Sequence, residues 1–380
     1  MDWFTNPKQG EARKLISYLA DAAKRERAAQ ELLRLGPDAV SALMEALQTQ
    51  DLSLLLVYQR TLARIPSASP ELINALRSAH PLIRGRVAEV FAISRDKKAV
   101  PVLLEALRGE FFTVRARSAI ALGNIGDKRV LPDLLPLLKD PEGEVRTAAC
   151  VAIGKFREPT TFDELANVLL DDPLIDVRHA ALKALGDSRH PAAVPFLMEA
   201  LRDSFWWFER EQSTQDLLTA IENMGEPVVM PLIEALGDRE GTVRRFAAMV
   251  LGKLRDPRAI EELGMILYDL HHEVSLTAAE ALAQFGGEAV GVLSEALKHP
   301  ESGVREAAIR GLDSIHDERV VPLLVEMLRD PDRDVRKQAI QSLGRLGDKR
   351  AVPALQGISG DRSDRDLAAL AKTVIEKLEE

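Results

Sequence analysis

The chain is poor in aromatic residues and has almost no cysteine. Aromatic residues make up 4% of the sequence and apolar residues 46%, so the interior must consist mainly of Leu, Ala, Val and Ile, which closely packed helices prefer. The single cysteine, Cys150, has no partner for an internal disulfide. These shortages argue against a β-rich fold and against a fold held by disulfides.

The chain also lacks an excess of positive charge and any long apolar run. Its formal net charge is −9 at pH 7, whereas proteins that bind nucleic acid or anionic membranes draw affinity from clustered Lys and Arg. No apolar stretch approaches the ~20 residues that span a bilayer, and residues 1–8 contain no apolar signal core. We therefore expect a cytoplasmic protein with no membrane partner, and nucleic-acid binding is disfavoured.

One sequence pattern recurs about twelve times, and residues 114–127 and 335–348 are two closely similar copies. The clearest copy has apolar residues at three- and four-residue spacing in 129–140 and again in 145–154, which predicts two helices. Asp140-Pro141 forms the turn between them, and Gly-Asp pairs such as Gly126-Asp127 end the second helix. A unit that cannot bury its own apolar face must stack on its neighbours. The pattern therefore predicts an all-α solenoid of about twelve two-helix repeats.

Two charged residues recur with the repeat. An Arg follows the first residue of the second helix in eight units, and an Asp closes many first helices. The arginines are Arg25, Arg84, Arg115, Arg146, Arg178, Arg244, Arg305 and Arg336. The aspartates are Asp140, Asp203, Asp238, Asp269 and Asp330. A binding determinant should vary between copies and a stacking device should recur, so we interpret these residues as a structural ladder between repeats.

The order of first helix, Asp-Pro turn, Val-Arg-x-x-Ala-Ala-x-Ala-Leu-Gly and Gly-Asp resembles the HEAT repeat, in particular the phycobilisome-lyase HEAT-like repeat. The resemblance covers residues from about Glu11 to Leu378. It implies a right-handed superhelix in which the second helices line a concave groove. We divide this continuous solenoid into N-terminal repeats with a cap (1–203), an aromatic insertion (204–212) and C-terminal repeats with a cap (213–380).

If the second helices line a groove, the positions two, six and ten after each anchor residue point into it. These positions carry eleven basic and six acidic side chains. Apolar residues Ile120, Val151, Met249 and Leu276 lie among them. The pattern favours a groove for an acidic segment of another protein, and a solvated face without such a role is the alternative. The predicted contact residues are Arg245, Met249 and Lys253 at the centre, with Lys155, Lys183, Arg310 and Arg345.

One repeat is irregular. The interval from Val177 to Ser213 is longer than the others and contains four consecutive aromatic residues, 205–208. In the same unit Ser213-Thr214 replaces Val-Arg, so a ladder arginine is missing. The sequence leaves open whether Trp206 and Trp207 bind a partner, including a second copy of the chain, or fill the gap left by the missing arginine.

No catalytic, cofactor-binding or metal-binding residue is predicted. Deoxyhypusine hydroxylase, which resembles this repeat, has His-Glu pairs at positions where this chain has His179-Ala180, and the His272-Glu273 pair here precedes its anchor residue. A DNA-glycosylase-like groove would need a stronger positive field. We expect a non-catalytic protein-interaction scaffold without a cofactor. The alternative is a phycobilin lyase-like subunit that attaches a chromophore or, with less support, a hydroxylase-like oxidoreductase.

Overall fold

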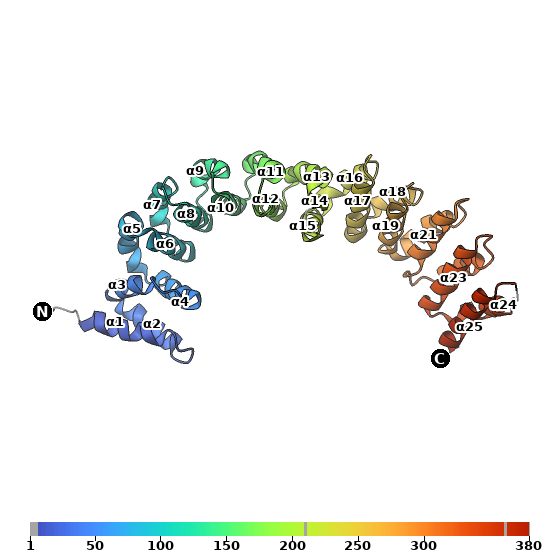
Figure 1. Ribbon diagram of the computed structural model, residues 1–380, viewed down its shortest axis with the longest axis horizontal. Coiled ribbons are helices and arrows are strands. Elements are labelled where there is room, and N and C mark those ends of the chain that lie inside the picture. The colour runs from blue at the N-terminus through green and yellow to red at the C-terminus, as the bar shows by residue number, and fades with distance from the viewer. Residues whose placement is uncertain (1–6, 209–210, 361–362, 380) are drawn as a thin grey trace. The chain divides into compact units, whose positions relative to one another are not determined.

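The computed structural model describes residues 7–208, 211–360 and 363–379. Throughout these segments the regular secondary structure is helical, which confirms the predicted all-α solenoid (Figure 1). The chain forms two compact units, Met1–Ala193 and Val194–Glu380. This division falls just ahead of the insertion that we placed at 204–212, of which residues 209 and 210 lie outside the described part.

The first unit contains six helix pairs in its described part. The first helices of the pairs are α1 (Pro7–Tyr18), α3 (Pro37–Ala46), α5 (Ser69–Ser78), α7 (Val100–Ala106), α9 (Leu131–Leu134) continued by η4 (Leu135–Lys139), and α11 (Phe162–Asp171). The second helices are α2 (Arg25–Leu35), α4 (Leu52–Ala63), α6 (Pro81–Ser94), α8 (Phe112–Ile125), α10 (Gly143–Gly154) and α12 (Ile175–Ser188).

The second unit contains six further pairs and one extra helical turn in its described part. The first helices are α13 (Val194–Arg202), α16 (Val229–Ala235), α18 (Ile260–Ile266), α20 (Val290–Ala296), α22 (Val320–Met327) and α24 (Val352–Ser359). The second helices are α15 (Glu211–Glu222), α17 (Gly241–Leu254), α19 (His272–Ala283), α21 (Ser302–Leu312), α23 (Arg333–Leu346) and α25 (Arg365–Glu379). The extra turn, α14 (Phe205–Phe208), is the described part of the insertion.

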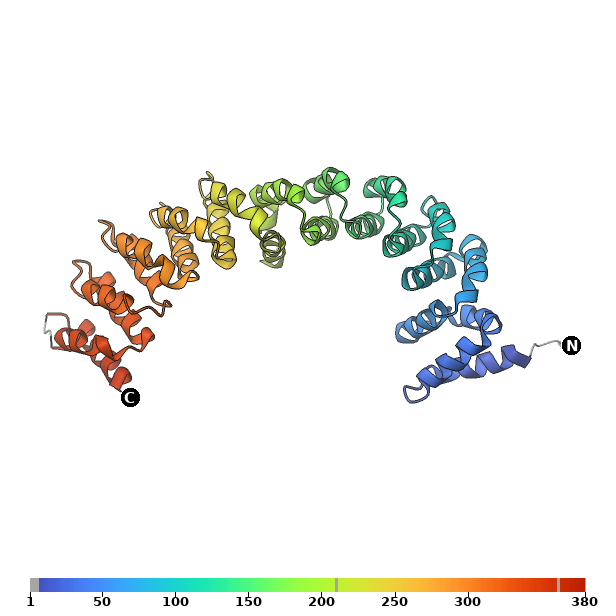
Figure 2. The same cartoon turned by 180° about the vertical axis from the view of Figure 1, so that it is seen from behind.

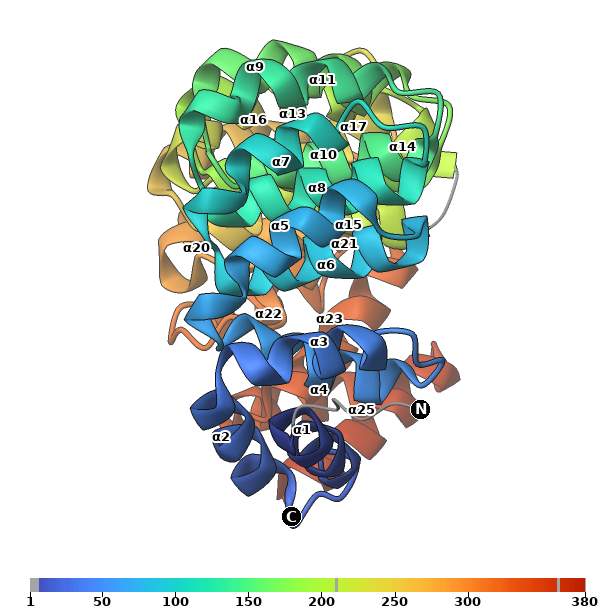
Figure 3. The same ribbon diagram turned by 90° about the vertical axis from the view of Figure 1, so that its left-hand side faces the viewer.

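Within each unit the helices form two layers. In the first unit the second helices α6, α8, α10 and α12 form one layer, in which each contacts the next. The first helices α9 and α11 belong to the other layer and lie above α10 and α12 in Figure 1. Figure 3 shows α6 beside α8 from another direction. In the second unit α17, α19, α21, α23 and α25 form the corresponding row (Figure 2). The second helices of each unit thus present one continuous face.

The recurring Leu-Gly allows second helices to approach closely. A Cβ on Gly123 in α8 would lie 2.7 Å from Cα of Ala152 in α10, and one on Gly252 in α17 would lie 2.7 Å from Cα of Ala281 in α19. Real side chains essentially never reach such distances. The Gly and Ala of the pattern therefore face each other across neighbouring repeats, where van der Waals packing is densest.

The turn after a second helix has a fixed construction. Gly126 ends α8 in the left-handed conformation with φ 77°, and the Asp127 side chain then accepts a hydrogen bond from the N–H of Arg129 (3.1 Å). In four repeats an arginine occupies the left-handed position instead, which costs an L-residue ~1–2 kcal/mol. These residues are Arg95, Arg157, Arg189 and Arg255, with φ between 49° and 53°.

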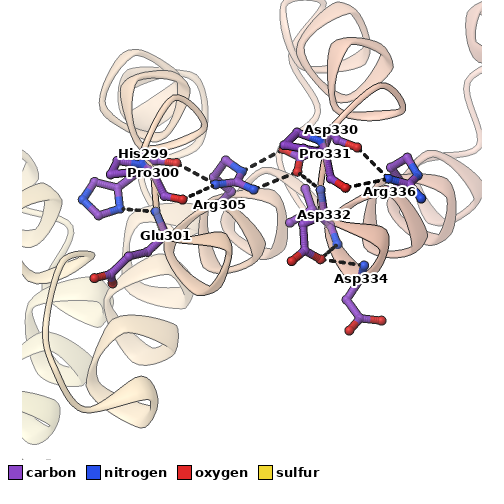
Figure 4. A network of polar contacts seen from close by, with 10 residues as sticks. His299, Pro300, Glu301, Arg305, Asp330, Pro331, Asp332, Asp334 and Arg336 are labelled. Atoms are coloured by element: carbon purple, nitrogen blue, oxygen red, sulfur yellow. Dashed lines mark hydrogen bonds and ion pairs between the residues drawn. The ribbon is translucent and has the colours of Figure 1, made fainter.

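The Arg and Asp ladder is present at four of the predicted arginines, while Arg25 and Arg336 bond backbone carbonyls of their own turns and Arg84 lies over the ring of Phe111. Arg305 donates to both carboxylate oxygens of Asp330 in the next repeat (2.7 Å each) and to the carbonyls of His299 and Pro300 in its own turn (2.7 and 2.9 Å). Figure 4 shows this network, which continues to Arg336 on the Asp330 carbonyl. The same two-pronged bond joins the pairs Arg115–Asp140, Arg146–Asp172 and Arg244–Asp269.

Burial and hydrogen bonding act against each other at these carboxylates. Burial raises the pKa of Asp140, but the bonds from Arg115 and from the Glu142 N–H outweigh it, so the pKa lies below its ordinary value. The side chains of Arg305 and Asp330 are only 9% and 4% exposed. Charges this deep are stable only as a pair, because removing one partner leaves the other desolvated.

The ladder arginine is missing beside the insertion, as the sequence indicated, but the position does not stay empty. Arg202, at the end of the first helix α13, bonds the Asp238 carboxylate at 2.9 Å, so an arginine from the first helix replaces the missing one. Thr214, which stands at the arginine position, donates to the carbonyl of Trp206. A different change occurs where Ser275 replaces the arginine: the ladder position of the next repeat is His299, not an aspartate. Loss of the cation thus coincides with loss of the anion.

The ladder makes a direct prediction about stability. Replacing Arg305 with Ala should lower the free energy of unfolding by ~3–5 kcal/mol, because Asp330 would stay buried without its counter-ion. Replacing Arg319 with Ala removes a pair with Asp317 in which the arginine is 55% exposed, and should cost less than ~1 kcal/mol. Denaturant titration followed by circular dichroism measures both. Equal losses for the two variants would contradict a structural role for the ladder.

Candidate functional site

The face made by the second helices is the candidate interface. Val151 on α10 is 36% exposed, and Ile120, Met249 and Leu276 are half-buried on α8, α17 and α19. The adjacent alanines of the pattern, such as Ala149 and Ala248, are fully buried. Apart from the buried Gly85 and Ala116, the described residues two, six and ten after each anchor therefore reach the surface, and their side chains differ between copies.

The central patch that we predicted lies together on α17. Arg245 and Met249 are half-buried and Lys253 is exposed. Both cations pair with acids of neighbouring repeats: Lys253 Nζ lies 3.1 Å from Glu222, and Arg245 lies 3.7 Å from Glu273 and over the ring of Phe246. This patch is therefore apolar at its centre and largely neutral at its edges.

The two remaining predicted cations of the second unit behave in the same way. Arg310 on α21 lies 3.8 Å from Glu280, and Arg345 on α23 lies 2.6 Å from Asp313. Glu222, Glu273 and Asp313 occupy positions that the count of groove residues left out: Glu222 and Asp313 lie one residue before a counted position, and Glu273 directly precedes its anchor residue Val274. The face in the second unit is thus less basic than the sequence indicated.

In the first unit, Lys155 and Lys183 line one cleft between α10 and α12, which we call the α10–α12 cleft. Its volume is about 290 Å³. Its lining residues are Val151, Gly154, Lys155, Arg157, Ala180, Lys183, Ala184 and Asp187. Lys183 pairs with Asp187 at 3.1 Å, whereas Lys155 donates to the amide oxygen of Asn124. The structure therefore brings together two predicted cations here and adds a third, Arg157.

Lys155 is held in an unfavourable environment for a cation. It follows α10 directly, and its pKa is lowered, first because it is partly desolvated and second because Arg95 repels it.

Arg157 was not predicted from the sequence, because it lies beyond the second-helix positions that define the predicted groove. The signal that could have found it is an arginine where other copies have the Gly of Gly-Asp.

The two tryptophans of the insertion are held by contacts within the protein. Trp206 is fully buried and its ring meets that of Phe205 edge-on, with centroids 5.8 Å apart. The indole N–H of Trp207, which is half-buried, donates to the carbonyl of Leu201 (3.0 Å). A partner contact at Trp206 is therefore not supported, because a residue without exposed surface cannot anchor a ligand, and Trp207 keeps only part of its surface for one.

Within the described segments no group of three or more His, Cys, Asp or Glu side chains is arranged to hold a metal ion, and none of their helices has the length and apolarity to cross a bilayer. Burial raises the pKa of the Cys150 thiol to about 12, so at neutral pH it is not a thiolate nucleophile.

Comparisons with known proteins agree with this architecture. The family model for HEAT repeats matches residues 69–150, 100–177, 131–218, 229–295 and 290–375. None of the curated proteins matches the sequence. Similar solved structures include Kap121p bound to Nup53p (15% identity, TM-score 0.60) and the karyopherin Kap121p bound to the extreme C-terminus of the protein phosphatase Cdc14p (14% identity, TM-score 0.59). Both alignments cover 100% of this chain but only 51% of Kap121p, so the chain spans about half of that protein's length.

A further similar structure is the complex of CpcE and CpcF of phycocyanin lyase from Nostoc sp. PCC7120. It has 23% identity over 59% of this chain and 92% of that chain, with a TM-score of 0.35. A likeness this weak does not bear on the question of lyase activity.

The burial of Trp206 generates a second prediction. Replacing Trp206 with Ala should lower the free energy of unfolding by ~3–5 kcal/mol, because a large interior cavity would form. Replacing the half-buried Trp207 with Ala should cost clearly less. Thermal denaturation of the full chain compares them, and a Trp206 variant that melts with the wild type would refute the structural role of the insertion.

Proposed function

The chain belongs to the HEAT-repeat family, and from this premise we propose that it is a non-catalytic scaffold that binds a segment of another protein along the faces of its second helices. The observation that carries the proposal is that two sets of residues in each repeat have different roles. The recurring residues pack between repeats or form the ladder, whereas the residues that vary between repeats form the exposed face.

The chemistry of that face suits a protein partner. Val151 and Met249 offer apolar contact area on α10 and α17, and charged side chains surround both. Such a mixture of apolar centres and polar surroundings is typical of protein interfaces. Many modest contacts along a row of helices would give affinity without a single deep pocket.

The similar solved structures support this kind of role. Kap121p is bound to Nup53p in one structure, to the SUMO protease Ulp1p in another and to the end of Cdc14p in a third. At 14–15% identity these likenesses establish the fold, and they show that a solenoid of this kind can hold protein segments.

We propose that the segment bound here is acidic. The support lies in the first unit, where Lys155 and Arg157 have no carboxylate partner among the described residues. We place this role in the cytoplasm, as the composition predicts. The bound protein can also be a second copy of the chain, held through the same face.

The proposed function predicts a difference between two exposed faces. Met249 lies on the second-helix face, and Met265 is 66% exposed on the first helix α18. With each tagged variant as bait in the native lysate, Met249→Gln should reduce capture of the partner about tenfold, the equivalent of ~1.4 kcal/mol. Met265→Gln should capture as much as the wild type.

The capture is repeated at low and high salt, and the captured proteins are identified by mass spectrometry. A wild-type chain that retains no protein above the level of an unrelated bait would refute the scaffold. Equal losses for the two methionine variants would place the interface elsewhere.

A further inference from the structure

The α10–α12 cleft differs from the rest of the second-helix faces in the way its cations are paired. In the second unit Lys253 lies against Glu222 and Arg345 against Asp313, each acid coming from the preceding repeat. The residue that plays this part for Lys155 is Asn124 on α8. An amide oxygen offers a dipole but no charge, so the positive charge of Lys155 is not neutralised within the repeat array.

A second cation in the cleft is also unneutralised. Arg157 is exposed, lines the cleft, and forms no ion pair with a carboxylate in the described segments. It occupies the left-handed region with φ 49°, where Gly126 and Gly347 serve in other repeats. Arg95, Arg189 and Arg255 take the same conformation in other repeats, and what distinguishes Arg157 is its place in the lining of this cleft.

The one acid of the cleft does not neutralise these cations. Asp187 pairs with Lys183 at 3.1 Å in the next turn of its own helix. Meanwhile Arg95, at the end of α6, repels Lys155. The cleft therefore carries Lys155 and Arg157 as uncompensated charges, and it offers a site where an anion would be favoured.

The floor of the cleft is apolar and shallow. Gly154 and Ala184 bring α10 and α12 together, since a Cβ on Gly154 would lie 2.6 Å from Cβ of Ala184. Val151, 36% exposed, stands beside them. A bound group must thus combine negative charge with an apolar part, which describes a carboxylate-rich peptide with an aliphatic side chain.

We propose that the α10–α12 cleft anchors an acidic peptide segment of the partner, with an aliphatic side chain of the segment on Val151 and flanking carboxylates on Lys155 and Arg157. This inference rests on the proposed function. A single-stranded nucleic acid is a poorer occupant, because bases stack on aromatic rings and the residues that line this cleft include none.

The test uses the full chain and a short fluorescein-labelled peptide of glutamates with one central leucine, followed by fluorescence anisotropy. Lys155→Glu with Arg157→Glu should weaken peptide binding at least about tenfold. Lys337→Glu with Lys372→Glu makes the same change of charge at exposed positions of α23 and α25 and should change it less than about twofold. Replacing the leucine of the peptide with glycine should weaken binding several-fold.

The glycine that other repeats use provides a gentler variant. Arg157→Gly removes the charge while keeping a residue suited to the left-handed backbone, and should weaken the peptide several-fold. Arg255→Gly, at the same backbone conformation after α17, should leave binding unchanged. Circular dichroism melting of all variants checks that the solenoid remains folded.

Three results of the peptide experiment would overturn the proposal. An undetectable interaction with the peptide, equal weakening by the two double variants, or tighter binding of an oligouridylate than of the peptide would each do so. Failure of the scaffold itself is a different result, in which the wild-type chain captures no partner. If the chain captures a partner and the Lys155 and Arg157 double variant captures it equally well, the scaffold stands and the cleft is not its anchor.

Discussion

Four largely buried arginines, Arg115, Arg146, Arg244 and Arg305, each connect their repeat to the next one. Arg305 illustrates the geometry, because its guanidinium binds two carbonyls of its own turn and both oxygens of Asp330. The bond fixes the position of one turn relative to its neighbour, and the close contact of Gly with Ala fixes the helices behind it. Because a single repeat cannot bury its own apolar face, the array depends on both contacts.

This dependence explains which parts of the sequence predict the structure. The two-layer solenoid, the helix pairs and the ladder all follow from recurring residues, since a repeated position must satisfy the same contact in each copy. Single departures follow different rules. Arg202 replaces the missing ladder arginine from another helix, and only spatial proximity to Asp238 shows that it does so.

The candidate site could be predicted only in part, for a similar reason. The register of Val151, Met249 and Leu276 follows from helical periodicity, so the exposed face was correctly located. Its charge was not, because an ion pair such as Lys253 with Glu222 joins two helices about one repeat apart in sequence. Counting charges along one face of one helix omits partners that approach from the side. The sequence also could not predict the burial of Trp206. Four consecutive aromatic residues mark an irregular repeat, but they do not show which ring is buried.

The pairing of charges therefore separates structure from recognition better than their number does. A cation that meets an acid of the neighbouring repeat contributes to the array, and its presence on the surface says little about a partner. Lys155 and Arg157 depart from this pairing, since Asn124 stands where an acid would neutralise the first and no carboxylate of the described residues pairs with the second. Stability alone would favour an acid at Asn124 and a glycine at Arg157. Two adjacent cations that meet no carboxylate among the described residues are best explained by an anion that arrives from outside the chain.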